Sequence, residues 1–231
     1  MYEVVSLKHN LNKEYFKNID TEEKAYWLGF IAADGCVYKM SKNAHRLQIN
    51  LSYRDIEHLE LFNKCLESDY KINIKQIKNS DICELKIASK QLTDDLIELG
   101  ITPNKSLKVK MPNIDIDLIP HFIRGYFDGD GCITYSETPT RFRYKFSIVG
   151  GESMLGSINT YMNQNINIYP INHSDALDLC TSNKQKIINI YHYLYDNANI
   201  YLTRKKEKFD YILSRFVGIQ NNNKVNWREP A

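Results

Sequence analysis

The stretch WLGFIAADG at residues 27–35 returns in altered form as IRGYFDGDG at residues 123–131. Each copy places a glycine four residues before a small residue and ends in Asp-Gly, so that the final acids are Asp34 and Asp130. A chain that carries one pattern twice is expected to consist of two related halves. We therefore expect the two copies to build a single site together.

Both copies are predicted to be helical from the residues at their edges. Asp20 is followed three residues later by Glu23, which is typical of a helix start. Asp117 is expected to cap the second helix. Gly35 and Gly131 are expected to end the two helices, because glycine adopts the left-handed cap conformation at little cost.

Small residues inside the predicted helices indicate that the helices pack against each other. Gly29 and Ala33 lie one turn apart on one face, as do Gly125 and Gly129. Glycine inside a helix costs about 1 kcal/mol relative to alanine, and close contact between two backbones supplies a reason for it. Such pairing brings together two negative helix ends, each with an aspartate. A cluster of carboxylate and carbonyl oxygens favours Mg²⁺ or Ca²⁺ over zinc.

The two stretches resemble the LAGLIDADG motifs of homing endonucleases, in the single-chain form that carries two copies. The resemblance implies an α+β fold of two pseudo-symmetric αββαββα halves, with antiparallel saddle-shaped sheets packed through the two motif helices. It implies that Asp34 and Asp130, at the eighth motif position, are catalytic acids that bind Mg²⁺, with Ca²⁺ or Mn²⁺ as substitutes. It also implies that the backbone carbonyls of Ala33 and Gly129 are metal ligands.

The family has a basic residue near the end of each repeat, and the resemblance implies a catalytic role for it. The matching residues are Lys105 in the first half and Lys205 in the second, with Lys206 as the alternative to Lys205. One departure from the family pattern is the sixth motif position, where Ala32 stands in the first copy and Asp128 in the second. This departure indicates asymmetry between the halves.

Two segments that follow the motifs alternate between apolar and polar residues, which is the pattern of half-buried strands. Neither polar set contains an acid, and a third segment near residue 72 continues the pattern. Side chains of these types hydrogen-bond to base edges and phosphates, and paired strands fit the major groove. The predicted DNA-binding residues are Arg46, Gln48, Asn50, Ser52 and Arg54 in the first half, Lys71, Asn73 and Lys75 in its third segment, and Arg141, Arg143, Lys145 and Ser147 in the second half.

The composition limits the class of protein. The chain has 231 residues, of which 43% are hydrophobic. Its net charge of +2 is low for a nucleic-acid binder, unless the basic residues are sorted onto one face, as the polar sets of the predicted strands indicate. It contains no apolar run long enough to cross a membrane and no signal-peptide pattern. Its five cysteines form no CxxC pair, so reduced thiols are expected. We expect an intracellular monomer, in a bacterial or phage-infected cytoplasm or in an organelle.

Residues 21–110 and 117–216 are predicted to form the two halves, joined by a short linker at 111–116 that contains a proline. Residues 1–20 form an N-terminal extension without a counterpart in the second half, and residues 217–231 are expected to be a poorly ordered tail. Besides the motif helices, the sequence predicts helices over residues 56–67, 91–99, 152–163, 184–195 and 204–216.

The resemblance implies a site-specific endonuclease for double-stranded DNA, which cleaves a long asymmetric target by metal-dependent phosphodiester hydrolysis. Two alternatives on the same fold stay open. One is an intron maturase whose partner is intron RNA, and the other is a DNA-binding regulator without catalytic activity. The repulsion expected between Asp34 and Asp130 argues against the regulator, because it is hard to justify without a bound cation.

Overall fold

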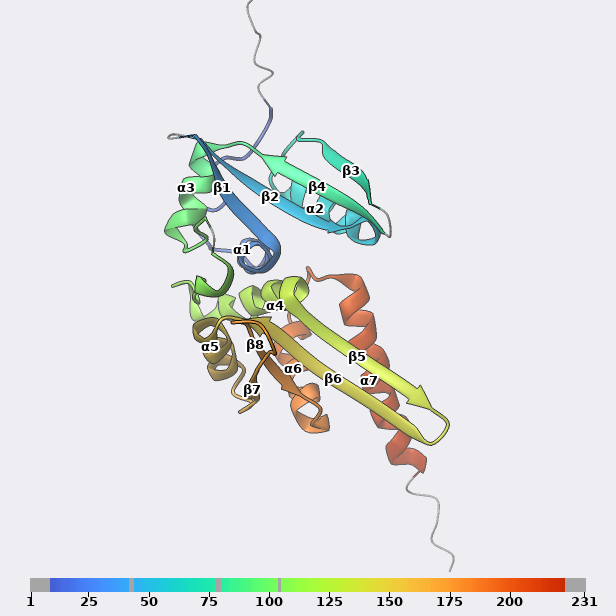
Figure 1. The fold of residues 1–231 in the computed structure, drawn as a ribbon. Helices are drawn as coiled ribbons and strands as arrows, with labels where there is room; N and C mark the ends of the chain where they lie inside the picture. Colours follow the sequence, from blue (N-terminus) through green and yellow to red (C-terminus); the bar gives the residue numbers. More distant parts are fainter. Residues whose placement is uncertain (1–8, 42–43, 78–79, 104, 223–231) are drawn as a thin grey trace, which may run out of the picture.

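Two helices lie side by side through the middle of the molecule, with one four-stranded sheet on either side of them (Figure 1). The structure is a computed structural model that describes residues 9–41, 44–77, 80–103 and 105–222. The first half consists of α1 (Glu22–Asp34), β1 (Gly35–Ser41), β2 (Ala44–Ser52), α2 (Ile56–Cys65), β3 (Ile72–Ile77), β4 (Ser80–Ile87) and α3 (Lys90–Glu98). The second half consists of α4 (Ile119–Asp130), β5 (Gly131–Thr138), β6 (Arg141–Gly150), α5 (Glu152–Met162), β7 (Asn167–Pro170), β8 (Leu177–Thr181), α6 (Lys184–Tyr195) and α7 (Thr203–Asn222).

The two sheets have the same antiparallel topology, with strand orders β1-β2-β4-β3 and β5-β6-β8-β7. Each motif helix leads directly into the edge strand of its own sheet. The predicted alternation is present, because Leu47, Ile49 and Leu51 of β2 are buried, as are Phe146 and Ile148 of β6. The predicted fold of two pseudo-symmetric halves is confirmed.

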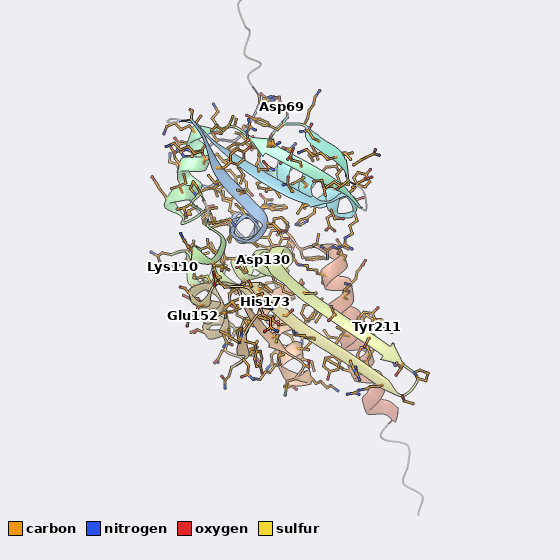
Figure 2. The ribbon with its side chains drawn as sticks, viewed as in Figure 1. Asp69, Lys110, Asp130, Glu152, His173 and Tyr211 are labelled. Carbon is orange, nitrogen blue, oxygen red and sulfur yellow. The ribbon has the colours of Figure 1, made fainter. Side chains whose placement is uncertain are left out.

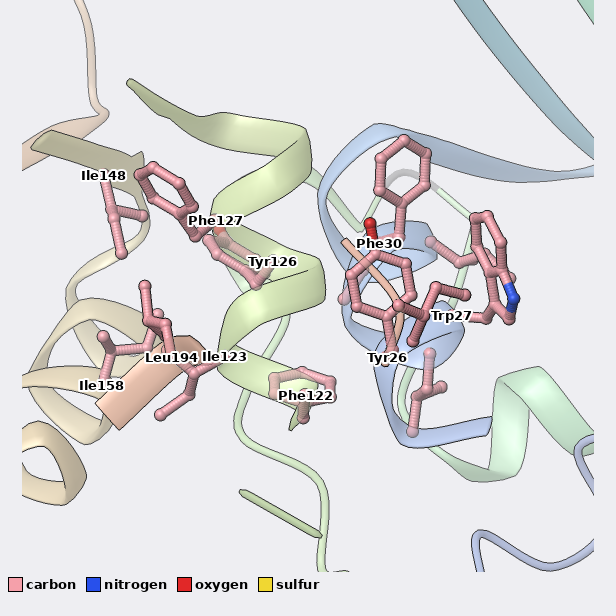
Figure 3. Close-up of a cluster of buried hydrophobic side chains, with 14 of the residues drawn as sticks. Tyr26, Trp27, Phe30, Phe122, Ile123, Tyr126, Phe127, Ile148, Ile158 and Leu194 are labelled. Carbon is pink, nitrogen blue, oxygen red and sulfur yellow. The ribbon is translucent and has the colours of Figure 1, made fainter. Parts of the chain in front are cut away.

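The motif helices α1 and α4 also supply much of the core of each half. Trp27 and Phe30 point from α1 into the first half, whereas Phe127 points from α4 toward Ile148 in the second half (Figure 3). All of these side chains are buried. Each motif helix therefore has one face that packs on its own half and another that faces the other helix.

The glycines of the motifs let the two helix backbones touch. A Cβ atom added to Gly29 would lie 2.0 Å from the carbonyl oxygen of Phe122, and one added to Gly125 would lie 1.9 Å from that of Tyr26. No side chain fits at these distances. The predicted close pairing of the two helices is confirmed, and their C-terminal ends lie together.

The ends of the motif helices differ from the sequence prediction in their details. Thr21, not Asp20, caps α1, because its hydroxyl accepts from the amide of Lys24 at 3.3 Å. Leu118 precedes α4 without a side-chain cap, so Asp117 does not cap this helix. Gly35 and Gly131 do follow the helices, but both have extended backbones, with φ of −76° and −91°. They are required instead because a side chain there would collide with the last turn of its own helix.

The predicted outer segments also need correction. Helix α7 runs to Asn222, past the predicted limit at Phe216, while residues 223–231 of the predicted tail lie outside the described residues. In the predicted N-terminal extension, Tyr15 and Phe16 are buried in the core of the first half, and residues 1–8 lie outside the described residues. Arg54 lies in a short 3-10 turn (Tyr53–Asp55) after β2 rather than in the strand. Among the described helices, none has the length and apolarity needed to cross a lipid bilayer.

Candidate metal centre and nucleic-acid interface

Asp34 and Asp130 are the last residues of α1 and α4, and they meet where the two helices end. The position that a Cβ atom of Gly129 would take lies 3.5 Å from Cγ of Asp34, so the two C-terminal turns are in contact. Both aspartates reach solvent at the surface, although protein atoms surround much of each carboxyl group. Asp130 lies between the two halves, far from Asp69 at one end of the molecule and from Tyr211 on α7 (Figure 2).

Protein atoms around the two carboxylates disfavour their charged forms. Burial raises the pKa of Asp34, although Lys205 and Lys105 act in the opposite direction. Burial and the negative charge of Asp34 raise the pKa of Asp130 to about 6. The shift of Asp130 thus includes repulsion from Asp34, and a cation bound beside the two acids would relieve it.

The two predicted lysines are buried beside the helix ends. The ammonium group of Lys105 donates to the carbonyl oxygens of Ala32 at 2.6 Å and Ala33 at 2.9 Å. Lys205 donates to the carbonyls of Phe127 at 2.8 Å, Asp128 at 2.7 Å and Gly131 at 2.6 Å, with a longer contact to Gly129 at 3.3 Å. Each lysine thus neutralises the negative end of one motif helix.

Burial lowers the pKa of both lysines, and the pKa of Lys205 falls to about 8. The alternative residue, Lys206, does not contact these helix ends. Its ammonium group lies 2.9 Å from a carboxylate oxygen of Asp210 and 3.2 Å from the hydroxyl of Tyr191. The geometry therefore places Lys205 at the centre and Lys206 on the flank of α7.

The residues at the helix ends fit a hard divalent cation. In the described part of the chain, neither Asp34 nor Asp130 has a lysine or arginine within ion-pair distance, so the oxygens of both carboxylates are available to bind a cation. The carbonyls of Ala33 and Gly129 each keep a lone pair beside the contact with a lysine. Among the described residues there is no group of three or more His, Cys, Asp or Glu arranged to hold a metal. The donor set consists of two carboxylates and backbone oxygens, which suits Mg²⁺ or Ca²⁺.

Asp34 and Asp130 line two different cavities. Asp34 lines a cavity of about 220 Å³ together with Asn50 and Ser52 of β2 and Arg204 of α7. Asp130 lines a cavity of about 390 Å³ whose other lining residues include Lys105, Cys36, Val149 and Gly150. The halves are alike in backbone but not in the chemistry that surrounds each acid.

A buried hydrogen-bond network crosses the seam, and the sequence did not predict it. The hydroxyl of Tyr26 on α1 donates to the carboxylate of Asp128 on α4 at 2.8 Å and lies 2.8 Å from Nε2 of His58 on α2. Asp128 also accepts from the backbone amide of Leu202 at 2.7 Å. Since the Tyr26 proton goes to Asp128, Nε2 of His58 carries the hydrogen that Tyr26 accepts. Asp128, the acid at the sixth position of the second motif, thus links α4 to α1, to α2 through Tyr26, and to the residue before α7. The first motif has Ala32 at this position and makes no equivalent link.

The predicted DNA-binding residues lie mostly on the outer faces of the two sheets. In β2 these are Arg46, Gln48, Asn50 and Ser52, and in β6 they are Arg141, Arg143, Lys145 and Ser147, all at least partly exposed and alternating with the buried residues. In β3, Asn73 and Lys75 share the outer face with β2, and Lys71 lies just before the strand. Arg54 is exposed next to the end of β2. The edge strands β1 and β5 add Tyr38, Thr134 and Ser136 to these faces, which the sequence reading left out.

The segments predicted to be DNA-binding strands contain no acid on their polar faces. The outer faces of the sheets nevertheless carry acids, which come from other strands. Glu84 of β4 lies opposite Asn50, and Asp178 of β8 lies opposite Val149. Glu84 pairs with Lys75 at 2.9 Å, and Asp178 pairs with Lys145 at 2.8 Å. The sequence did not identify which strands pair with β4 and β8. It therefore gave no indication that Glu84 and Asp178 lie on the outer faces.

Comparison with known proteins finds similarity at the level of structure. No family model matches the chain, and no curated protein matches it. Meganuclease I-SmaMI bound to uncleavable DNA superposes with a TM-score of 0.63 at 14% identity, over 89% of this chain and 94% of that one. LAGLIDADG meganuclease I-AabMI bound to uncleaved DNA gives 0.61 at 13% identity, over 85% and 91%. I-SmaMI bound to an uncleaved DNA target with calcium ions gives 0.57 at 16% identity, over 87% and 93%.

Proposed function

We propose that this chain, which has the fold of the single-chain LAGLIDADG homing endonucleases, is a site-specific endonuclease for double-stranded DNA. One observation carries the proposal. Asp34 and Asp130 meet at the ends of two packed helices, between two sheets whose outer faces carry basic and amide side chains. Two neighbouring carboxylates destabilise a packed interface, because they repel each other, and they provide the oxygen ligands that a divalent cation needs.

The proposed cofactor is Mg²⁺, with Ca²⁺ or Mn²⁺ as substitutes, and the calcium ions present with I-SmaMI on its uncleaved target support the use of a divalent ion. Asp34 and Asp130 would hold it, with Ala33 and Gly129 offering carbonyl oxygens. When bound, such an ion supplies an activated water and stabilises the leaving oxygen of a phosphodiester.

Lys105 and Lys205 would act from fixed positions. Their ammonium groups are tied to backbone carbonyls, so they keep the helix ends in place while adding two positive charges beside the acids. Those charges favour the extra negative charge that develops on the phosphate during hydrolysis. In this role the lysines need not move or transfer a proton.

The proposed substrate is a long duplex without palindromic symmetry. The two sheets offer outer faces of different sequence on opposite sides of the motif helices, so each would read a different half of the target (Figure 1). One chain holds both acids, so a monomer suffices for two cuts. We also propose an intracellular location, where a double-stranded DNA substrate is available.

The experiment that tests this function incubates the protein with a randomised duplex library and Mg²⁺ and sequences the broken ends. We expect double-strand breaks at a defined sequence, and their loss in Asp34→Asn and in Asp130→Asn. Asp69→Asn is the matched control, because Asp69 is an exposed acid far from the helix ends (Figure 2). Selective binding without any cleavage by the wild-type protein would contradict the nuclease and favour a regulator.

A further inference from the structure

Both sheets carry one carboxylate at the same register position of their outer faces. The first residues of β1 and β5, which follow the motif acids, pair with Ile49 and Ile148, so these two isoleucines occupy equivalent places. Opposite Ile49 and Ile148 on the next strands lie Leu85 and Leu179. The residues just before these leucines are Glu84 and Asp178. The acids are therefore counterparts, although neither belongs to the repeated motif.

Glu84 is almost completely covered by polar side chains of its own sheet. Its side chain is 3% exposed. Lys75 approaches one carboxylate oxygen at 2.9 Å, Lys86 approaches the other at 2.7 Å, and the amide nitrogen of Gln48 donates at 2.9 Å. Burial alone would raise the pKa of Glu84, yet the two ammonium groups lower it below its usual value, so the acid is charged.

Asp178 has a similar but smaller set of contacts. The ammonium group of Lys145 lies 2.8 Å from one of its oxygens. Its other oxygen is buried, with no partner among the described residues. Tyr169 of β7 lies opposite Asp178, as Asn73 of β3 lies opposite Glu84. In each half, an acid of the fourth strand in sequence order therefore holds a lysine of the outer face.

An acid in this position is costly for DNA binding in general. A carboxylate repels phosphates and cancels the charge of lysines that would otherwise release counterions from the duplex. A lysine or glutamine that is held in one orientation has a different use, since Lys recognises guanine O6 and N7 and Gln recognises adenine N6 and N7 in the major groove. The buried carboxylate converts mobile phosphate-binding side chains into fixed donors.

We propose that Glu84 and Asp178 are positioning residues for base recognition, each of which orders the polar side chains of its own sheet over one half of the DNA target. The inference rests on the proposed function and deepens it, because it names what sets sequence preference.

The test compares Glu84→Gln, Asp178→Asn and the wild-type protein in selection from a library of randomised duplexes. Glu84→Gln should relax base preference in one half of the selected target, and Asp178→Asn in the other half only. Binding of Glu84→Gln to a fixed duplex of arbitrary sequence should become tighter, and the slope of log affinity against log salt should steepen by about 1 to 2. Glu60→Gln is the matched control, because this exposed acid belongs to α2, whose buried residues pack against the inner face of the same sheet.

The outcomes separate this inference from the proposed function. Unchanged base preference and salt slope in Glu84→Gln would overturn the inference alone. Equal relaxation over both halves of the target, together with a lower melting temperature, would also overturn it, because that pattern reports a general loss of structure. Failure of the wild-type protein to select any duplex would overturn the proposed function, and the inference with it.

Discussion

Arg124 of α4 donates from Nη2 to a carboxylate oxygen of Glu22 on α1 at 2.6 Å, so a buried ion pair joins the two motif helices near the start of α1, whereas their C-terminal ends carry the two acids Asp34 and Asp130. Arg124 is 1% exposed, and it also donates to the backbone carbonyls of Ile200 at 2.7 Å and Leu194 at 2.9 Å. One buried cation thus joins the first half, α4 and the segment that leads into α7.

We expect Arg124→Met to lower the free energy of unfolding by about 3 kcal/mol, because it leaves Glu22 and two carbonyls without their buried partner. Denaturant unfolding followed by circular dichroism measures this change. Lys90→Met is the control, since Lys90 pairs with Asp94 on an exposed surface and should change stability by less than about 0.5 kcal/mol. Equal effects of the two substitutions would contradict the role assigned to Arg124.

The glycines of the seam allow a second prediction about stability. Gly29→Ala should destabilise the protein by at least about 2 kcal/mol, because its Cβ would lie 2.0 Å from the carbonyl oxygen of Phe122 and the helices would have to separate. Gly156→Ala in α5 is the matched control. A Cβ at Gly156 meets nothing within 4 Å, so this change should stabilise the helix by about 0.5 to 1 kcal/mol. Thermal melts of both variants give the comparison, and opposite signs are expected.

The sequence predicted the seam because its signal is local. Gly29 and Gly125 sit in repeated stretches, and a small residue one turn later indicates close helix packing without knowledge of the rest of the chain. The same holds for the alternation in β2 and β6, where the period of the strand separates the buried from the exposed residues. These features depend on neighbours within a few residues.

The features that the sequence did not predict depend on partners far along the chain. Arg124 stands inside the second motif, yet its role depends on Glu22 and on a loop near residue 200. Glu84 lies on the outer face because β4 pairs with both β2 and β3, and this pairing cannot be read from the residues around Glu84. Strand order and side-chain partners of this kind follow from tertiary packing, which one sequence does not reveal.

His58 makes folding stability depend on pH. Burial lowers its pKa to about 4, whereas an unfolded histidine titrates near 6.5. Because the folded state disfavours the proton, His58 costs nothing above about pH 6.5 and destabilises the fold progressively as the pH falls toward 4, by about 3 kcal/mol in all. His58→Gln keeps a donor for Tyr26 and removes the titration, so the difference in unfolding free energy between this variant and the wild type should change over that interval. A difference that is constant between pH 7 and 4 would contradict the prediction.

Arg143 and Lys145 lie on the same face of β6 but should contribute differently to DNA binding. Arg143 is exposed and has no ion pair within the described part of the chain, whereas Lys145 is held by Asp178. Arg143→Ala should reduce the slope of log affinity against log salt by about 1, the amount expected for one phosphate contact. Lys145→Ala should leave this slope nearly unchanged and alter base preference instead. Equal reductions of the slope would show that Asp178 does not fix Lys145.

For the proposed endonuclease, the two cavities at the helix ends predict that the two DNA strands are cut at unequal rates. At equivalent positions beside the acids, Asn50 lines the cavity of Asp34 and Val149 lines that of Asp130. An amide can orient an attacking water and an isopropyl group cannot, so the strand served by the Asp34 cavity should be cut first. With each strand labelled separately, a nicked intermediate with one broken strand should build up and then decay.

Substitution at Val149 isolates the cause of this inequality. Val149→Asn should shorten the lifetime of the nicked intermediate, because it gives the second cavity the amide that it lacks, whereas Val149→Ala should leave the order of the cuts unchanged. Both substitutions fall on an exposed position, where Val149 is 36% accessible, so neither should disturb folding. Simultaneous cutting of the two strands by the wild-type protein would show that the chemistry around each acid does not limit its rate. In that case a step common to both halves, such as bending of the DNA or release of the product, would control the reaction.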